Sequence, residues 1–105
     1  MRDWDKLELL FMMQAKFQFR FRFTKVGLDK IASAIMAEGG ELWEKGKGKW
    51  WSKKTHPREE KVEEMIDILH FFLIGCLELG ITPQELLDEY SKKLAENYRR
   101  QKRGY

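Results

Sequence analysis

Residues 62–79, VEEMIDILHFFLIGCLEL, carry the pattern that decides the fold. Apolar side chains recur there at intervals of three and four residues, which is the spacing of one face of an α-helix. They are Val62, Met65, Ile66, Leu69, Phe72, Leu73, Cys76 and Leu77. One of its carboxylates, Asp67, lies in the segment 65–69, MIDIL, which is otherwise apolar. Because a bare charge is strongly unfavourable in apolar surroundings, Asp67 must be paired, coordinated or protonated.

Helical signals continue on both sides of this run. Residues 57–60, PREE, are typical of a first helical turn with proline at its first position, and residues 82–85, TPQE, have the form of a capping box. Residues 28–45 repeat the apolar spacing. We therefore predict helices near residues 4–23, 28–45, 57–79 and 83–101, in an all-α, four-to-five-helix bundle that forms a single domain over residues 1–105.

Residues 17–23, FQFRFRF, allow two interpretations. The alternation of apolar and polar residues favours a strand, but a lone strand needs a partner and no other segment offers one. In a helix, Phe17 with Phe21 and Phe19 with Phe23 form two stripes on nearly opposite faces, as expected for a helix buried between subunits. We prefer the helix.

Length and composition indicate an oligomer. A chain of 105 residues builds only a modest core, yet 43% of it is apolar, with 7 Phe, 4 Trp and 3 Tyr. We expect part of this surface to lie between subunits, in a homodimer or a dimer of dimers. The single cysteine, Cys76, is expected to pack as a small hydrophobe. The sequence shows no signal peptide and no membrane-spanning run, so we expect a cytoplasmic protein without a membrane partner.

The net charge of +3 is unevenly distributed. Residues 45–61 hold seven basic and two acidic side chains, and residues 92–103 hold six basic and one acidic. Such blocks suit the phosphates of a nucleotide or a nucleic acid, although solvated helix ends have the same composition. A small basic helical protein that binds nucleic acid is one hypothesis, but it leaves Asp67 unexplained.

Two carboxylate pairs support a different hypothesis. Glu38 and Glu41 are three residues apart, as are Glu64 and Asp67, so each pair shares one helical face. If antiparallel helices bring the pairs together, the carboxylates repel one another unless cations intervene. Oxygen ligands of this kind suit Mg²⁺ or Mn²⁺, which often share their shells with substrate phosphates. For an isolated Asp67 the alternative is an ion pair with a basic residue.

Two glycines, Gly39 and Gly40, interrupt this acidic turn, although each costs about 1 kcal/mol relative to alanine inside a helix. We interpret them as leaving room beside the carboxylates for a packed helix or a ligand. Glu44, off the shared face, is interpreted as an ordinary surface residue. A zinc site is disfavoured by the isolated histidines and cysteine, and the sequence contains neither a P-loop nor a GxSxG elbow.

Three motifs resemble the all-α NTP pyrophosphatases, the superfamily of MazG and the dimeric dUTPases. They are EGGEL at residues 38–42, KWWS at 49–52 and EMIDILHF at 64–71. The second motif and the His-Phe pair of the third point to the dUTPase branch. The closing positions are also similar to that branch: Tyr90, Lys93, Asn97, Arg100, Gln101, Gly104 and Tyr105.

The resemblance implies a dimeric helical enzyme that cleaves a deoxynucleoside triphosphate between its α and β phosphates, in the dUTPase branch dUTP to dUMP and pyrophosphate. It implies Mg²⁺, with Mn²⁺ possible, held by Glu38, Glu41, Glu64 and Asp67, and Glu41 also activates the attacking water. The implied phosphate ligands are Lys49, Lys93 and Arg100, with a polar contact near the sugar or phosphates from Asn97.

The resemblance leaves the base open. Gln14 matches a first-helix position that faces the base, but Gln18 stands where a shorter Asn or Asp is more usual. Trp51 is a candidate for stacking on the base or, alternatively, an interface tryptophan. His70 is interpreted as a supporting or packing residue. The alternative substrates are dCTP and other canonical or modified nucleotides, as in the MazG branch.

Overall fold

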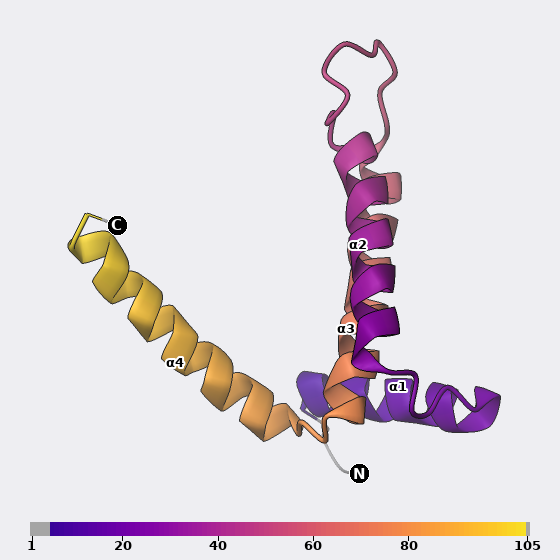
Figure 1. Ribbon diagram of the computed structural model, residues 1–105, viewed down its shortest axis with the longest axis vertical. Helices are drawn as coiled ribbons and strands as arrows, with labels where there is room; N and C mark the ends of the chain where they lie inside the picture. The colour runs from indigo at the N-terminus through magenta and orange to yellow at the C-terminus, as the bar shows by residue number, and fades with distance from the viewer. Residues whose placement is uncertain (1–4, 105) are drawn as a thin grey trace.

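The computed structural model describes residues 5–104, which contain four α-helices and no strand (Figure 1). The helices are α1 (Lys6–Phe21), α2 (Leu28–Lys45), α3 (Arg58–Glu78) and α4 (Pro83–Lys102). The predicted all-α class and the four predicted helices are confirmed. The predicted helix start at residue 4 and the motif residue Tyr105 lie outside the described residues.

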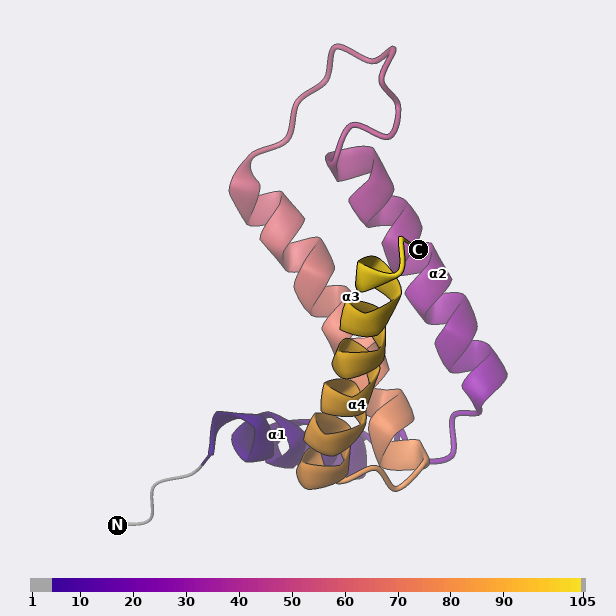
Figure 2. The same ribbon diagram turned by 90° about the vertical axis from the view of Figure 1, so that its left-hand side faces the viewer.

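The hairpin of α2 and α3 is the longest feature of the fold. The two helices run antiparallel side by side and are joined by the loop of residues 46–57 (Figures 1 and 2). Ile31 of α2 and Ile74 of α3 are both buried. A Cβ added at the buried Gly75 would lie 3.5 Å from the Ile31 side chain, an ordinary van der Waals distance, so α2 and α3 are in close contact here.

A small core lies where α1 crosses the base of this hairpin. Phe11, Leu73 and Cys76 are buried there, and Leu86 of α4 packs against them. The prediction that Cys76 packs as a core residue is confirmed. The core is small because a chain of this length buries only a limited share of its apolar surface.

Helix α4 leaves this base and diverges from the hairpin (Figure 1). Beyond the packing of Leu86 in its first turn, the backbone of α4 lies close to that of α1 but not to that of α2 or α3. Its apolar side chains are consequently exposed: Leu87, Tyr90, Leu94 and Tyr98. Within residues 5–104 no single helix is long and apolar enough to cross a membrane, although α3 and α4 together satisfy that test with a bend of 109° between them.

Two of the predicted helix starts rest on a proline, and one of them differs from the observed start by one residue. The Thr82 hydroxyl accepts a hydrogen bond from the Glu85 amide at 3.1 Å, which confirms the predicted cap of α4. Pro57 was predicted at the first helical position, but its extended backbone (φ −70°, ψ 162°) places it just before α3. The proline therefore precedes the first turn instead of forming part of it.

The segment of alternating phenylalanines is helical as far as Phe21, which confirms helix over strand there. The predicted end at residue 23 is wrong because Arg22 adopts a left-handed conformation with φ 59° and ends the helix. Phe23 then folds back, and its ring stacks on that of Phe17 at a centroid distance of 5.9 Å. The predicted stripe of Phe19 with Phe23 is therefore absent, and Phe19 is 84% exposed.

Candidate metal and nucleotide site

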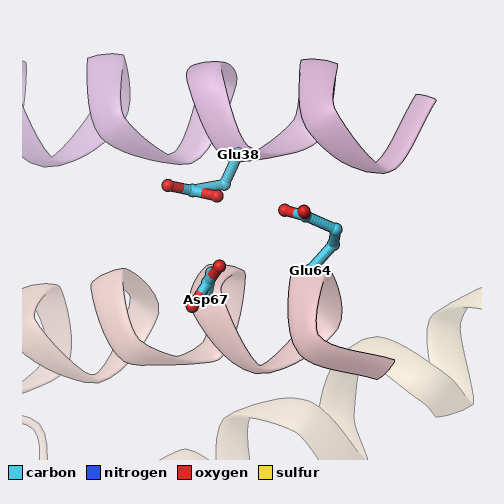
Figure 3. A group of neighbouring side chains, drawn as sticks. All are labelled: Glu38, Glu64 and Asp67. Carbon is cyan, nitrogen blue, oxygen red and sulfur yellow. The ribbon is translucent and has the colours of Figure 1, made fainter. Parts of the chain in front are cut away.

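Three carboxylates face one another across the hairpin. Glu38 projects from α2 toward Glu64 and Asp67 of α3 (Figure 3). Each residue offers one oxygen, and these oxygens all lie within 4.8 Å of one another. The antiparallel arrangement assumed from the sequence therefore brings three of the four predicted metal ligands together.

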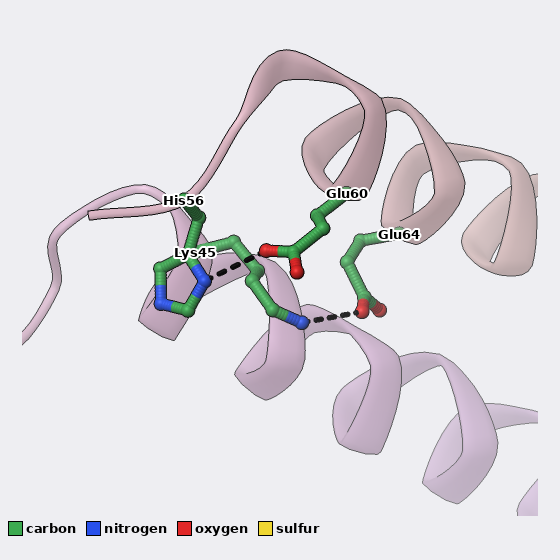
Figure 4. Close-up of polar contacts among 4 residues, drawn as sticks. All are labelled: Lys45, His56, Glu60 and Glu64. Carbon is green, nitrogen blue, oxygen red and sulfur yellow. Dashed lines mark hydrogen bonds and ion pairs between the residues drawn. The ribbon is translucent and has the colours of Figure 1, made fainter. Parts of the chain in front are cut away.

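Glu64 is the most buried of the three, with 8% of its surface exposed, whereas Asp67 is only half-buried. The Oε1 atom of Glu64 accepts a hydrogen bond from the ammonium of Lys45 at 3.2 Å (Figure 4). Its Oε2 atom is buried without a hydrogen-bond partner. The ion pair considered for Asp67 thus occurs at Glu64, and it satisfies only one of the two carboxylate oxygens.

The electrostatics of the cluster are those of crowded like charges. Desolvation raises the pKa of the Glu38 carboxyl, and the negative charges of Asp67, Glu64 and Glu41 raise it further. The hydrogen bond that Lys45 donates to Glu64 raises the pKa of the Lys45 ammonium. A divalent cation would relieve the repulsion and give the buried Glu64 oxygen a partner. The oxygen-only donor set therefore fits Mg²⁺ or Mn²⁺.

Glu41, the fourth predicted ligand and the predicted catalytic base, is exposed and lies outside this group of three. It remains close enough for its charge to act on Glu38. Both predicted roles of Glu41 stay predictions.

Lys45 was not singled out from the sequence, although a signal for it exists. It lies seven residues after Glu38, which at 100° per residue returns to nearly the same face of α2. Its pair with Glu64 joins α2 to α3, and beside it His56 pairs with Glu60 at 2.8 Å (Figure 4). The two pairs connect the loop end of α2, and the loop itself, to α3.

An apolar pocket adjoins the carboxylate cluster. Its volume is about 300 Å³, and it lies among α1, α2, α3 and the segment before α2. It is lined by Phe17, Phe23, Val26, Lys30, Ile31, Ala34, His70, Phe71 and Ile74. Ala34 lies one helical turn before Glu38, and His70 one turn after Asp67, so the pocket and the cluster are neighbours along both helices.

The predicted base contact Gln14 is buried beside this pocket. Its amide nitrogen donates to the Gln18 oxygen at 3.0 Å, and its own oxygen lies 3.1 Å from Nδ1 of His70. The His70 ring also packs edge-on against Phe17 and Phe71. The structure thus places His70 in contact with Gln14, where its ring can orient the amide.

The loop that closes the hairpin surrounds a basic hollow of about 310 Å³. Lys49 pairs there with Glu44 at 3.1 Å, so Glu44, interpreted from the sequence as an ordinary surface residue, has a partner in the predicted phosphate ligand. Trp51 is 62% exposed and packs edge-on against Trp50. Its role as a base-stacking or an interface residue stays a prediction.

The three predicted substrate residues of α4 are not brought to the cluster within one chain, because the backbone of α4 lies close to neither α2 nor α3. Lys93 and Arg100 both pair with Glu96, and Asn97 is exposed. Their predicted contacts with phosphates and sugar remain predictions.

The described residues define an all-α protein with helix-borne carboxylates arranged to hold a cation. Residues 6–85 match the family described as dUTPase, and the chain belongs to this family. It is also 37% identical over 82 residues to a dCTP pyrophosphatase of Enterobacteria phage LZ5. That match covers 73% of this chain but 45% of the phage protein, so the chain spans less than half the length of this curated relative. No solved structure matches the chain.

Proposed function

We propose that the chain is a Mg²⁺-dependent nucleoside triphosphate pyrophosphohydrolase that cleaves between the α and β phosphates. The observation that carries this proposal is the group of Glu38, Glu64 and Asp67, with one buried oxygen of Glu64 left without a partner, in a member of the dUTPase family. Paired helical carboxylates of this kind bind a cation that contacts substrate phosphates.

In this proposal the residues of the hairpin have three separate roles: metal binding, proton acceptance and phosphate contact. Glu38, Glu64 and Asp67 bind Mg²⁺ or Mn²⁺, which when bound polarises a phosphoryl oxygen and offsets charge that develops on it. Glu41, exposed beside them, accepts a proton from the attacking water. Lys49, in the basic hollow, meets the charge of the outer phosphates.

The apolar pocket beside the carboxylate cluster is proposed to hold the base. Its apolar walls favour a planar ring, and the amide of Gln14 borders the neighbouring surface between α1 and α3. We propose dUTP as the substrate, converted to dUMP and pyrophosphate. A second candidate is dCTP, which the name of the phage relative favours. Uracil and cytosine present opposite hydrogen-bonding groups at N3 and at the substituent of C4, and an amide such as Gln14 can serve either.

A homodimer, or a dimer of dimers, is proposed as the working form. Exposed apolar side chains support it on α3 and α4, among them Met65, Ile66, Leu87, Tyr90 and Leu94. Exposed apolar side chains in such number favour a subunit interface that covers them. Sedimentation velocity from micromolar to submicromolar concentration measures the state, and a monomer throughout would contradict the proposal.

Turnover provides the test of the proposed function. The protein is incubated with Mg²⁺ and dUTP, dCTP and the other deoxynucleoside triphosphates in turn, and pyrophosphate and monophosphate are quantified. We expect both products from dUTP and none in excess chelator. Glu64→Gln should abolish turnover, whereas Glu89→Gln, which changes an exposed carboxylate of α4, should retain it. Absence of turnover on every nucleotide, with the metal shown to be bound, would refute the proposal.

A further inference from the structure

We propose that Lys45 is an internal counter-cation for Glu64 whose positive charge opposes the divalent metal, so that Lys45 sets the metal affinity of the site. This inference rests on the metal site of the proposed function and assigns a role to a residue outside the predicted ligand set. Lys45 is therefore a positioning residue, which acts through Glu64.

The contact between the two residues is a specific one. The Lys45 ammonium lies 3.2 Å from Oε1 of Glu64, and the two side chains are only 20% and 11% exposed. The exposed pair of Lys49 with Glu44 keeps about half of each side chain in water, at 48% and 49%. Because water screens Lys45 and Glu64 far less, their attraction is the stronger of the two.

Glu64 divides its two oxygens between different environments. Oε1 is held by Lys45, whereas Oε2 is buried with no partner and belongs to a residue whose carboxylate approaches Glu38 and Asp67. Without a metal, Lys45 is the ammonium that directly compensates this crowded group. A divalent ion that uses Glu64 must enter beside that ammonium and is repelled by it.

The side chain of Lys45 is suited to withdrawal. Its flexible four-carbon stem starts in the last turn of α2, and the residue also lines the basic hollow of the hairpin loop. The ammonium can therefore move from Glu64 toward the solvent in that hollow. Metal binding and release of the ion pair would then be a single exchange of one cation for another on Glu64.

The test measures metal affinity without nucleotide. Mn²⁺ binding is followed by electron paramagnetic resonance in the full chain and in Lys45→Met, Lys45→Arg and Lys92→Met. Lys92 is the matched control, since its pair with Glu89 is exposed on α4. We expect Lys45→Met to bind Mn²⁺ about tenfold more tightly, because a nearby positive charge is removed. Lys45→Arg, which keeps the charge, and Lys92→Met should stay near the unmodified protein. Equal or weaker binding by Lys45→Met would overturn the inference.

A second measurement follows the counter-cation role without metal. In excess chelator, Lys45→Met should lower the Tm more than Lys92→Met does, and added Mn²⁺ should raise the Tm of Lys45→Met by a larger increment than that of the unmodified chain. Should Lys45→Met not fold, Lys45→Gln keeps a donor for Glu64 without the charge and carries the same expectations. Failure of either expectation in a folded variant would count against the inference. The proposed enzymatic function fails separately, when the unmodified protein binds Mn²⁺ but releases no pyrophosphate.

Discussion

The two glycines in the acidic turn of α2 give a prediction that separates stability from function. Gly39 and Gly40 lie inside the helix, and a Cβ added to either would meet no atom within 4 Å. Within residues 5–104, therefore, no neighbouring group requires glycine at these positions. We predict that replacing both by alanine stabilises the protein.

The expected gain follows from helix propensity alone. Glycine is about 1 kcal/mol less favourable than alanine inside a helix, so Gly39→Ala with Gly40→Ala should raise the free energy of unfolding by about 2 kcal/mol. With a urea m-value of roughly 2 kcal/mol per molar, the unfolding midpoint should rise by about 1 M. Circular dichroism during urea titration, at low protein concentration and without metal, measures the shift. A lower midpoint would show that another part of the molecule occupies this space and would refute the reasoning.

A larger side chain tests what the open space is for. If it receives substrate or a second subunit, Gly40→Leu should keep its helical signal and an unfolding midpoint at least as high as that of the unmodified chain, but lose turnover. Ala32→Leu, at another exposed position of α2, is the matched control and should retain turnover. Unchanged folding together with unchanged turnover in Gly40→Leu would contradict the interpretation that the glycines leave room for a ligand or a packed helix.

Three further changes test single features of the structure. Asp67→Asn should reduce the rate of pyrophosphate release at least about 100-fold while circular dichroism stays unchanged, since one proposed metal ligand loses its charge. The Cys76 thiol is buried, and desolvation raises its pKa, so Ellman's reagent at pH 7 should react with it only after unfolding in urea; rapid reaction in the folded protein would contradict this burial. Thr82→Ala should cost about 1 kcal/mol of stability in urea titration through loss of the α4 cap, whereas Thr55→Ala in the loop should change it by less than about 0.5 kcal/mol.

The helices were predictable because their signals are local. Apolar spacing, proline positions and the Thr82 cap act within a few residues, and the structure contains all four helices. The end of α1 was not predictable in the same way. Arg22 adopts a left-handed conformation that permits Phe23 to return onto Phe17, and that contact depends on the folded chain instead of on any spacing.

The candidate site was predictable to the level of helical faces. The two carboxylate pairs identified the facing surfaces of α2 and α3, and three of the four carboxylates do meet. Their relative burial depends on how the two helices cross, which no local pattern encodes. For this reason the sequence indicated Asp67 as the carboxylate in apolar surroundings, whereas in the structure Glu64 is the buried carboxylate and Lys45 is its partner.

The position of α4 connects the predicted substrate residues that lie away from the carboxylates with subunit association. This helix carries Lys93, Asn97 and Arg100 together with an exposed apolar face, and its backbone lies close to neither helix of the metal-binding hairpin. Exposed apolar side chains are unfavourably hydrated, so the helix gains free energy when another surface covers them. In the proposed dimer the contact that covers α4 also fixes the position of its basic residues. Nucleotide binding and subunit association would then stabilise the same arrangement, and by linkage each would strengthen the other.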